Sequence, residues 1–299
     1  MLIILLFCFL GGCILKKIKN IILNIVIIIL IVNIGYFTYQ IYYEMVSNKT
    51  NNNIKAEISK NVSIQEESSY NVGGYDESKF PSETIAQTGN ENITSIFNPQ
   101  DTVPSKFIYA DFEKLKAQNK DTVAWLWVPG TKVNYSVTQT IDNSYYLTNN
   151  FNKEKNQAGW IFGDFRSNFE TLGRNSVIYG HNQLDLSMFG DLGKLIDTEG
   201  WFKKTENKFI YLSTEKTSYV FKIISVYISN PNSEYIQQGM LNDTEYQAFL
   251  NTIVSKNEIK DISDSVNIND KILTLSTCKN HGQSRLVVTA KLVKYKNVE

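Results

Sequence analysis

The stretch Lys271-Ile-Leu-Thr-Leu-Ser-Thr-Cys278, followed seven residues later by Arg285, is the most informative part of the chain. Its alternation is that of a β-strand, in which successive side chains point to opposite faces. Leu273 and Leu275 share one face, and the other face carries Thr274, Ser276 and Cys278. The stretch therefore predicts a strand that ends on a thiol on its less apolar face.

A second alternating run covers residues 285–293, with residues 279–284 between the two runs. If the runs pair as a hairpin, Arg285 begins its strand beside Cys278. A guanidinium there would favour the thiolate, or bind an oxyanion formed next to the sulfur.

The thiol has no partner within its own domain. The other two cysteines, Cys8 and Cys13, lie in an N-terminal apolar stretch. A single cysteine in an exported domain indicates intermolecular pairing or a reactive group.

Short β-like runs dominate the C-terminal two thirds of the chain. Eight of them are separated by turn residues and predict a mainly β closed barrel or sandwich: 123–128, 132–138, 159–162, 176–179, 208–212, 219–229, 271–277 and 285–293. Apolar spacing predicts an amphipathic helix at 243–259, capped by Asn242 or Asp243, before the cysteine strand. Shorter helical segments are predicted at 109–118 and 188–196.

The N-terminal region, residues 1–43, predicts a membrane anchor. Its main apolar run, about residues 21–43, matches the roughly 20 residues that a spanning helix needs. Lys16, Lys17 and Lys19 precede it and a cluster of tyrosines ends it. The positive-inside rule predicts a single pass with a cytoplasmic N-terminus and an extracellular C-terminal domain.

Residues 1–15 form a second, shorter apolar run. It is either a helix in a tight hairpin or an extension from an early start codon. Leu10-Gly-Gly-Cys13 resembles a lipoprotein cleavage box, but no basic region precedes it. A cleavable signal peptide is disfavoured because the longer apolar run follows the lysines.

Residues 44–105 are rich in Asn, Ser, Glu, Lys and Thr, and they predict a flexible extracellular tether because so polar a segment buries little surface. Residues 106–299 would then form the catalytic domain. The formal net charge of +0 implies no nucleic-acid partner.

A cysteine nucleophile needs a proton shuttle, and the chain has 2 histidines. His181 follows the run 176–179, where Gly180 permits close backbone approach. His281 lies three residues after Cys278, in a predicted exposed loop that suits preorganised catalysis poorly. The residues alone favour His181 and leave His281 as the alternative.

Each of these residues also has a purely structural interpretation. A cysteine at a strand end is often a small buried hydrophobe. Cys278, His281 and His181 would also supply three ligands of a zinc site, but no residue stands out as the fourth.

Thr274-Leu-Ser-Thr-Cys278 with Arg285 resembles the active-site strand pair of sortases, in the form typical of class B. Further segments resemble class B sortases in the expected order: Trp125-Leu-Trp-Val-Pro-Gly-Thr131, Tyr145-Tyr-Leu147, Ala158-Gly-Trp-Ile-Phe162 with Asp164, Tyr179-Gly-His-Asn182 and Ser187-Met-Phe-Gly-Asp-Leu-Gly193. The resemblance covers about residues 107–293.

This resemblance implies an eight-stranded sortase β-barrel with a few helices, including the long one before the cysteine strand. By position, Cys278 would be the nucleophile, His181 the general acid/base and Arg285 the oxyanion- or substrate-orienting group. Auxiliary or substrate-binding roles would fall to Ser276, Thr277 and Asn182. No cofactor or metal is implied.

The implied activity is that of a membrane-anchored cysteine transpeptidase of Gram-positive bacteria. It would cleave the C-terminal sorting signal of secreted proteins through a thioacyl-enzyme. It would then join them to an amine of a lipid-linked cell-wall precursor peptide.

Two features depart from the class B pattern. The loop 279–284 is shorter than in several members, and Lys279 stands where an acidic residue can occur. The Asp-Pro-aromatic lid of class C enzymes is absent.

Two rival interpretations remain. An L,D-transpeptidase would carry a Ser/Thr-His-Gly-Cys pattern, whereas here His281 and Gly282 follow the cysteine. A membrane-tethered extracellular metal- or haem-binding module would use Cys278 and His281 as ligands.

Overall fold

The structure is a computed structural model that describes residues 2–66, 71–72 and 103–298, except 232, 238, 240, 241, 263, 280 and 281. The chain divides into two compact units, Met1–Ser47 and Asn48–Glu299.

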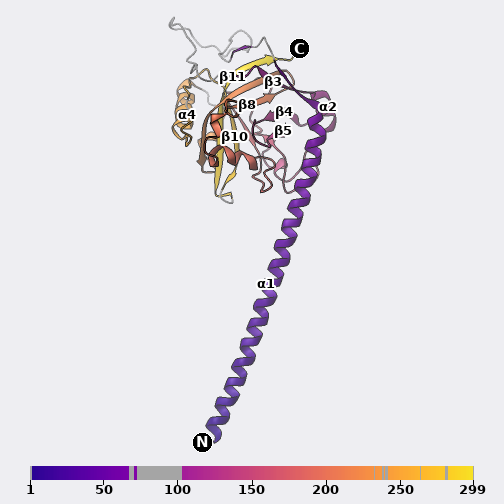
Figure 1. The fold of residues 1–299 in the computed structure, drawn as a ribbon, viewed down its shortest axis with the longest axis vertical. Coiled ribbons are helices and arrows are strands. Elements are labelled where there is room, and N and C mark those ends of the chain that lie inside the picture. The colour runs from indigo at the N-terminus through magenta and orange to yellow at the C-terminus, as the bar shows by residue number, and fades with distance from the viewer. Residues whose placement is uncertain are drawn as a thin grey trace. The chain divides into compact units, whose positions relative to one another are not determined.

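The first unit belongs to one long helix, α1, which spans Leu2–Ile58 and continues into the second unit (Figure 1). Within the described residues, Ile18–Asn61 includes the one candidate membrane span by length and composition. The predicted apolar N-terminal helix is therefore confirmed. The hairpin alternative for residues 1–15 is wrong, because α1 runs on without a turn and the chain has no proline before Pro81 to break it.

Eight strands of the second unit form a closed barrel in the order β10-β7-β6-β5-β4-β8-β9-β11, and the pairing of β10 with β11 closes it. This confirms the predicted eight-stranded barrel. The strands are β4 Thr122–Trp127, β5 Asn134–Thr138, β6 Phe162–Gly163, β7 Asn175–Tyr179, β8 Phe209–Ser213, β9 Thr217–Ser229, β10 Ile272–Lys279 and β11 Ser284–Asn297. A short strand β2, Asn71–Val72, pairs with β11 on its other side.

Alternation in β10 and β11 separates the inside of the barrel from its outside. Leu273 and Leu275 are buried in the main core, together with Leu286 and Val288 of β11. The outward residues Thr274 and Ser276 are also buried, because other segments cover this face. The predicted two-faced strand is thus present, and both faces are packed except at its end.

Helix α4, Asp243–Ser255, covers the barrel wall over β9 and β10 (Figure 1). Its apolar face packs on Ile224 and Ile272 and consists of Tyr246, Phe249, Leu250 and Ile253. The Asn242 side chain accepts a hydrogen bond from the amide of Glu245 and caps the helix, as one of the two predicted caps. The helix ends before the predicted residue 259 because Asn257 and Glu258 bond to the backbone of β9 instead.

Two other predicted helices differ from the structure. Helix α2 spans Phe112–Gln118 and is capped by Asp111, whereas Tyr109 lies on the preceding strand. The segment 188–196 forms a 3-10 helix, η3 Gly190–Gly193, followed by α3 Lys194–Asp197. Met188 cannot start a helix because its φ of 50° is left-handed.

The compact unit begins earlier than the predicted catalytic domain. Ile54 and Ile58 of α1 are buried in the main core, and β1 (Val62–Glu66) pairs with β3 (Lys106–Ala110). The prediction of a tether from residue 44 is therefore wrong for residues 48–66, because this burial and pairing offset the loss of chain entropy. Residues 73–102 of the predicted tether lie outside the described residues.

Candidate active site

Cys278 lies near the end of β10, half-buried, with a free thiol. It follows the buried outward residues Thr274 and Ser276 on the same face of the strand. The thiol thus lies where this covered face opens toward solvent, a position suited to a nucleophile.

Arg285 is the partner of Cys278 across the hairpin. The two Cα atoms are in register in the antiparallel pair β10–β11, and Lys279 pairs with Ser284 at the turn. Directly opposed residues have Cβ atoms about 4.5–5.5 Å apart on one face. The hairpin predicted from the sequence is confirmed. The Arg285 Nη1 donates to the carbonyls of Gly282 at 2.9 Å and Ser284 at 3.0 Å. These two bonds fix one terminal nitrogen of the guanidinium.

His181 follows β7, which pairs in parallel with β10, the strand that carries Cys278. Tyr179 and Ser276 form the last pair of this register, and His181 and Cys278 each follow it by two residues. The amide of Gly180 donates to the Ser276 carbonyl at 3.3 Å. The Asn182 side chain donates to the Cys278 carbonyl at 2.8 Å, which joins the two strand ends. The fold therefore brings together Cys278, Arg285, His181 and Asn182.

Backbone groups hold the His181 imidazole. Its Nε2 lies 2.7 Å from the Leu147 carbonyl oxygen. A carbonyl only accepts, so Nε2 carries the proton and Nδ1 of the neutral ring has the lone pair. Gly159 packs against the same ring: a Cβ there would lie 3.0 Å from the His181 Cδ2. The half-buried ring thus has one nitrogen fixed and one for proton exchange.

The two predicted auxiliary residues of β10 lie on opposite faces. Ser276 faces outward with Cys278, and its hydroxyl donates to the Tyr235 hydroxyl at 3.2 Å. Thr277 alternates to the inward face, where its side chain is buried. Ser276 therefore shares a surface with the thiol, and Thr277 supports the strand from within.

Tyr235, which the sequence analysis missed, lies on a 3-10 helix, η6, spanning Glu234–Ile236. Its ring packs with Tyr227 and Val287 on the outer wall. Burial raises the pKa of Tyr235, against the opposing effects of the bond to Ser276 and of nearby Arg285. Its hydroxyl therefore stays protonated beside the site. A tyrosine in a loop without a motif gives no sequence signal for this position.

A partly buried charge network, centred on Asp164, bonds to η6. Asp164 is fully buried and takes two hydrogen bonds from Arg166, from Nε at 2.8 Å and Nη2 at 2.7 Å. It accepts a further bond from the Tyr179 hydroxyl at 2.9 Å, and Arg166 also donates to the Ile236 carbonyl. Burial alone would raise the pKa of Asp164, but these donors outweigh it and the pKa is lowered. The sequence motif of residues 158–162 with Asp164 does not indicate that this carboxylate bonds to Arg166 and Tyr179.

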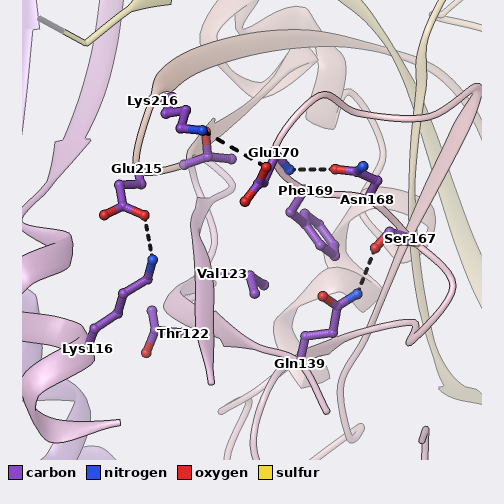
Figure 2. Close-up of a pocket in the computed structure, with 11 residues that line it drawn as sticks. Lys116, Thr122, Val123, Gln139, Ser167, Asn168, Phe169, Glu170, Glu215 and Lys216 are labelled. Atoms are coloured by element: carbon purple, nitrogen blue, oxygen red, sulfur yellow. Dashed lines mark hydrogen bonds and ion pairs between the residues drawn. The ribbon is translucent and has the colours of Figure 1, made fainter. Parts of the chain in front are cut away.

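A cavity of about 350 Å³ lies apart from these residues (Figure 2). Its wall includes residues 167–170, which precede β7, whereas His181 follows the end of β7. The cavity is therefore at the opposite end of the barrel. Its charged side chains pair with each other, Lys116 with Glu215 and Lys216 with Glu170.

The rival ligand sets depend on His281, which lies outside the described residues. Among the residues that are described, no group of three or more His, Cys, Asp or Glu side chains is placed to hold a metal ion.

Adjacent strand ends thus carry a half-exposed thiol, an imidazole with a free nitrogen and a guanidinium. These are the nucleophile, the acid/base and the oxyanion-binding group that acyl transfer requires. The sortase domain model matches residues 126–293. The chain belongs to the sortase family, and it is a cysteine transpeptidase.

Sortase B proteins are among the relatives that it matches within this family. It is 38% identical over 186 residues to sortase B of Listeria monocytogenes, covering 61% of this chain and 73% of the relative. A structure of sortase B from B. anthracis matches with a TM-score of 0.62 and 30% identity, covering 84% of this chain and 99% of that one. A Staphylococcus aureus sortase B–substrate complex matches with a TM-score of 0.55 and 34% identity, covering 61% and 84%. The resemblance to class B is thereby confirmed.

Proposed function

We propose that this transpeptidase cleaves a C-terminal sorting signal of secreted proteins and transfers them to an amine of a cell-wall precursor peptide. Cys278 is the nucleophile, His181 the general acid/base and Arg285 the oxyanion-stabilising group. The observation that supports the proposal is the register of Cys278 with Arg285, together with the end of the β7–β10 register two residues before both His181 and Cys278. A substrate complex of the Staphylococcus aureus relative supports a protein substrate.

The reaction has two acyl transfers. The Cys278 thiol gives its proton to the unprotonated Nδ1 of His181 as the sulfur attacks a peptide carbonyl carbon, and Arg285 donates hydrogen bonds to the resulting oxyanion. The His181 Nδ1 then passes this proton to the leaving amine as the peptide C–N bond breaks, so that a thioester remains on Cys278 and the imidazole is neutral again. A wall-peptide amine then attacks the thioester and loses a proton to His181 as the C–S bond breaks, and His181 returns that proton to the Cys278 thiolate. The products are the new peptide bond and the regenerated enzyme.

The apolar part of α1 supports membrane anchoring. We propose a single pass with the lysines before residue 20 in the cytoplasm and the barrel outside the cell. Protease added to intact protoplasts should remove a C-terminal tag and spare an N-terminal one. The reverse protection pattern would contradict this orientation.

The direct test of the reaction uses the full chain in lipid nanodiscs with a library of sorting-signal peptides. We expect Cys278→Ala to abolish both cleavage and transfer to an added amine, while Cys13→Ser, in the apolar helix, retains them. A thiol-reactive peptide analogue should label Cys278 and show by mass spectrometry a single adduct there. Continued cleavage by Cys278→Ala would overturn the proposed nucleophile.

A further inference from the structure

We propose that Asn51, at the end of α1 that belongs to the barrel unit, is a positioning residue for the His181 imidazole. The inference rests on the proposed role of His181 as general acid/base. Asn51, more than a hundred positions before His181 in the sequence, would then join the Leu147 carbonyl and Gly159 as a group that holds this ring.

Asn51 is buried and bonds to the segment that carries Gly159. Its Nδ2 donates to the Gly159 carbonyl at 2.9 Å. The Asn156 side chain donates to the Asn51 Oδ1 at 3.1 Å, and the Asn51 Nδ2 is 3.4 Å from the Asn156 Oδ1. Asn156 also shapes its own turn, because its Oδ1 accepts the amide of Ala158. One side chain of α1 thus fixes the turn 156–159 at two points.

This turn is in direct contact with the histidine and with the carbonyl that holds it. Gly159 has a left-handed φ of 56°, and a Cβ there would lie 2.8 Å from the Leu147 carbonyl oxygen and 3.0 Å from the His181 Cδ2. The Leu147 carbonyl accepts the hydrogen bond from the His181 Nε2. With no space between these groups, a shift of Gly159 must displace the ring or its acceptor.

The chemistry of Asn51 fits this position. The Gly159 carbonyl needs a donor and the Asn156 amide needs an acceptor, and one amide side chain supplies both. Loss of the donor would leave a buried carbonyl unsatisfied and let the turn relax. The next two residues, Asn52 and Asn53, have the same side chain on the same helix but are exposed. They provide matched controls for an effect specific to position 51.

The decisive variant is Asn51→Asp in the full chain, which keeps the size and the acceptor but removes the donor. We expect kcat to fall about tenfold, below the ~10²-fold that a misplacement of about 1 Å costs, with KM changed less than twofold. Asn51→Ala should act in the same direction, and Asn53→Ala should match the wild type. The nitrogen spectrum of His181 should change from one Nε2–H tautomer to a mixture in Asn51→Asp.

Thermal melting of each variant separates positioning from folding. If Asn51→Asp destabilises the fold too far, Asn156→Ala, which removes the partner amide from the barrel side, should produce the same loss of kcat and the same tautomer mixture. Unchanged kcat, or an unchanged tautomer despite a lower melting temperature, would overturn the inference. A normal Asn51→Asp beside an inactive His181→Ala would overturn this inference alone, whereas an active His181→Ala would overturn the proposed function with it.

Discussion

The two ends of the barrel hold their charged and reactive groups in different ways. At the far end, the lysines and glutamates around the cavity pair with one another (Figure 2). At the catalytic end, within the described part of the chain, the hydrogen bonds of the His181 and Arg285 side chains go to backbone carbonyls.

This difference separates a solvated surface from a site prepared for reaction. A carboxylate partner would neutralise the guanidinium and compete with a developing oxyanion. A backbone carbonyl fixes the geometry while the positive charge remains available. Within the described residues, His181 and Arg285 therefore combine fixed positions with no carboxylate partner, and variants at the two ends should differ in what they change.

Among the variants that compare the two ends, the largest effect is expected at Arg285. Arg285→Ala should lower kcat about 10²–10³-fold, as the loss of an oxyanion donor does. Arg285→Lys should recover little, because an ammonium cannot keep two carbonyl bonds and also reach the oxyanion with a planar fork. Steady-state kinetics on a sorting-signal peptide measure both.

Arg174 supplies the control for this prediction, because it bonds to Asp243 at the start of α4, away from Cys278. Arg174→Ala should lower stability and leave kcat near that of the wild type. Near-normal turnover in Arg285→Ala would remove the distinction between the two ends.

The second effect concerns Asp164, the buried carboxylate beside the catalytic end. Asp164→Asn should lower the free energy of unfolding by about 2 kcal/mol at pH 7. This is less than the roughly 3–5 kcal/mol that breaking a fully buried ion pair costs, because the Arg166 side chain is 42% exposed. Since the folded-state pKa of Asp164 is lowered, its contribution is present above the unfolded pKa of about 3.9 and is lost as pH falls through the folded value.

Urea unfolding at pH 7 and at about pH 3 tests this linkage. The difference in the free energy of unfolding between the wild type and Asp164→Asn should be smaller at the lower pH. A gap that stays constant would show that the carboxylate charge does not stabilise the fold.

The hairpin and the barrel could be predicted because their information is local. Strand alternation puts Cys278 on the outward face, and the short connection to Arg285 favours a hairpin in which the two residues pair. The residues alone favour His181 over His281 but do not bring it near Cys278, because a parallel register between β7 and β10 joins segments about a hundred residues apart.

The groups that support the site could not be predicted. Leu147 acts through its carbonyl, which any residue possesses, and Asn51 belongs to a polar run whose composition predicts a tether. Tyr235 lies in a loop without periodicity. Such contacts follow from three-dimensional packing, and no residue pattern records them.

A smaller effect is expected at Lys279, the departure from the class B pattern. Its ammonium pairs with Asp197 at 2.6 Å, and the two side chains are 25% and 62% exposed. Such a pair contributes about 0–1 kcal/mol, so Lys279→Met should change kcat/KM less than about threefold. Lys279→Glu should do more, because it places a like charge opposite Asp197, and added salt should reduce that loss.

The smallest effect is expected at the far end. Lys116→Met and Glu215→Gln, alone and together, should leave kcat/KM unchanged and shift the free energy of unfolding by less than about 1 kcal/mol, because the two side chains are 38% and 58% exposed. The double variant tests for coupling between them. This pair lies in the cavity wall at the far end of the barrel, away from His181 and from the Leu147 carbonyl that accepts its hydrogen bond. A large loss of turnover in these variants would therefore mean that the two ends are coupled through the barrel. The contrast between a solvated end and a prepared end would then have to be abandoned.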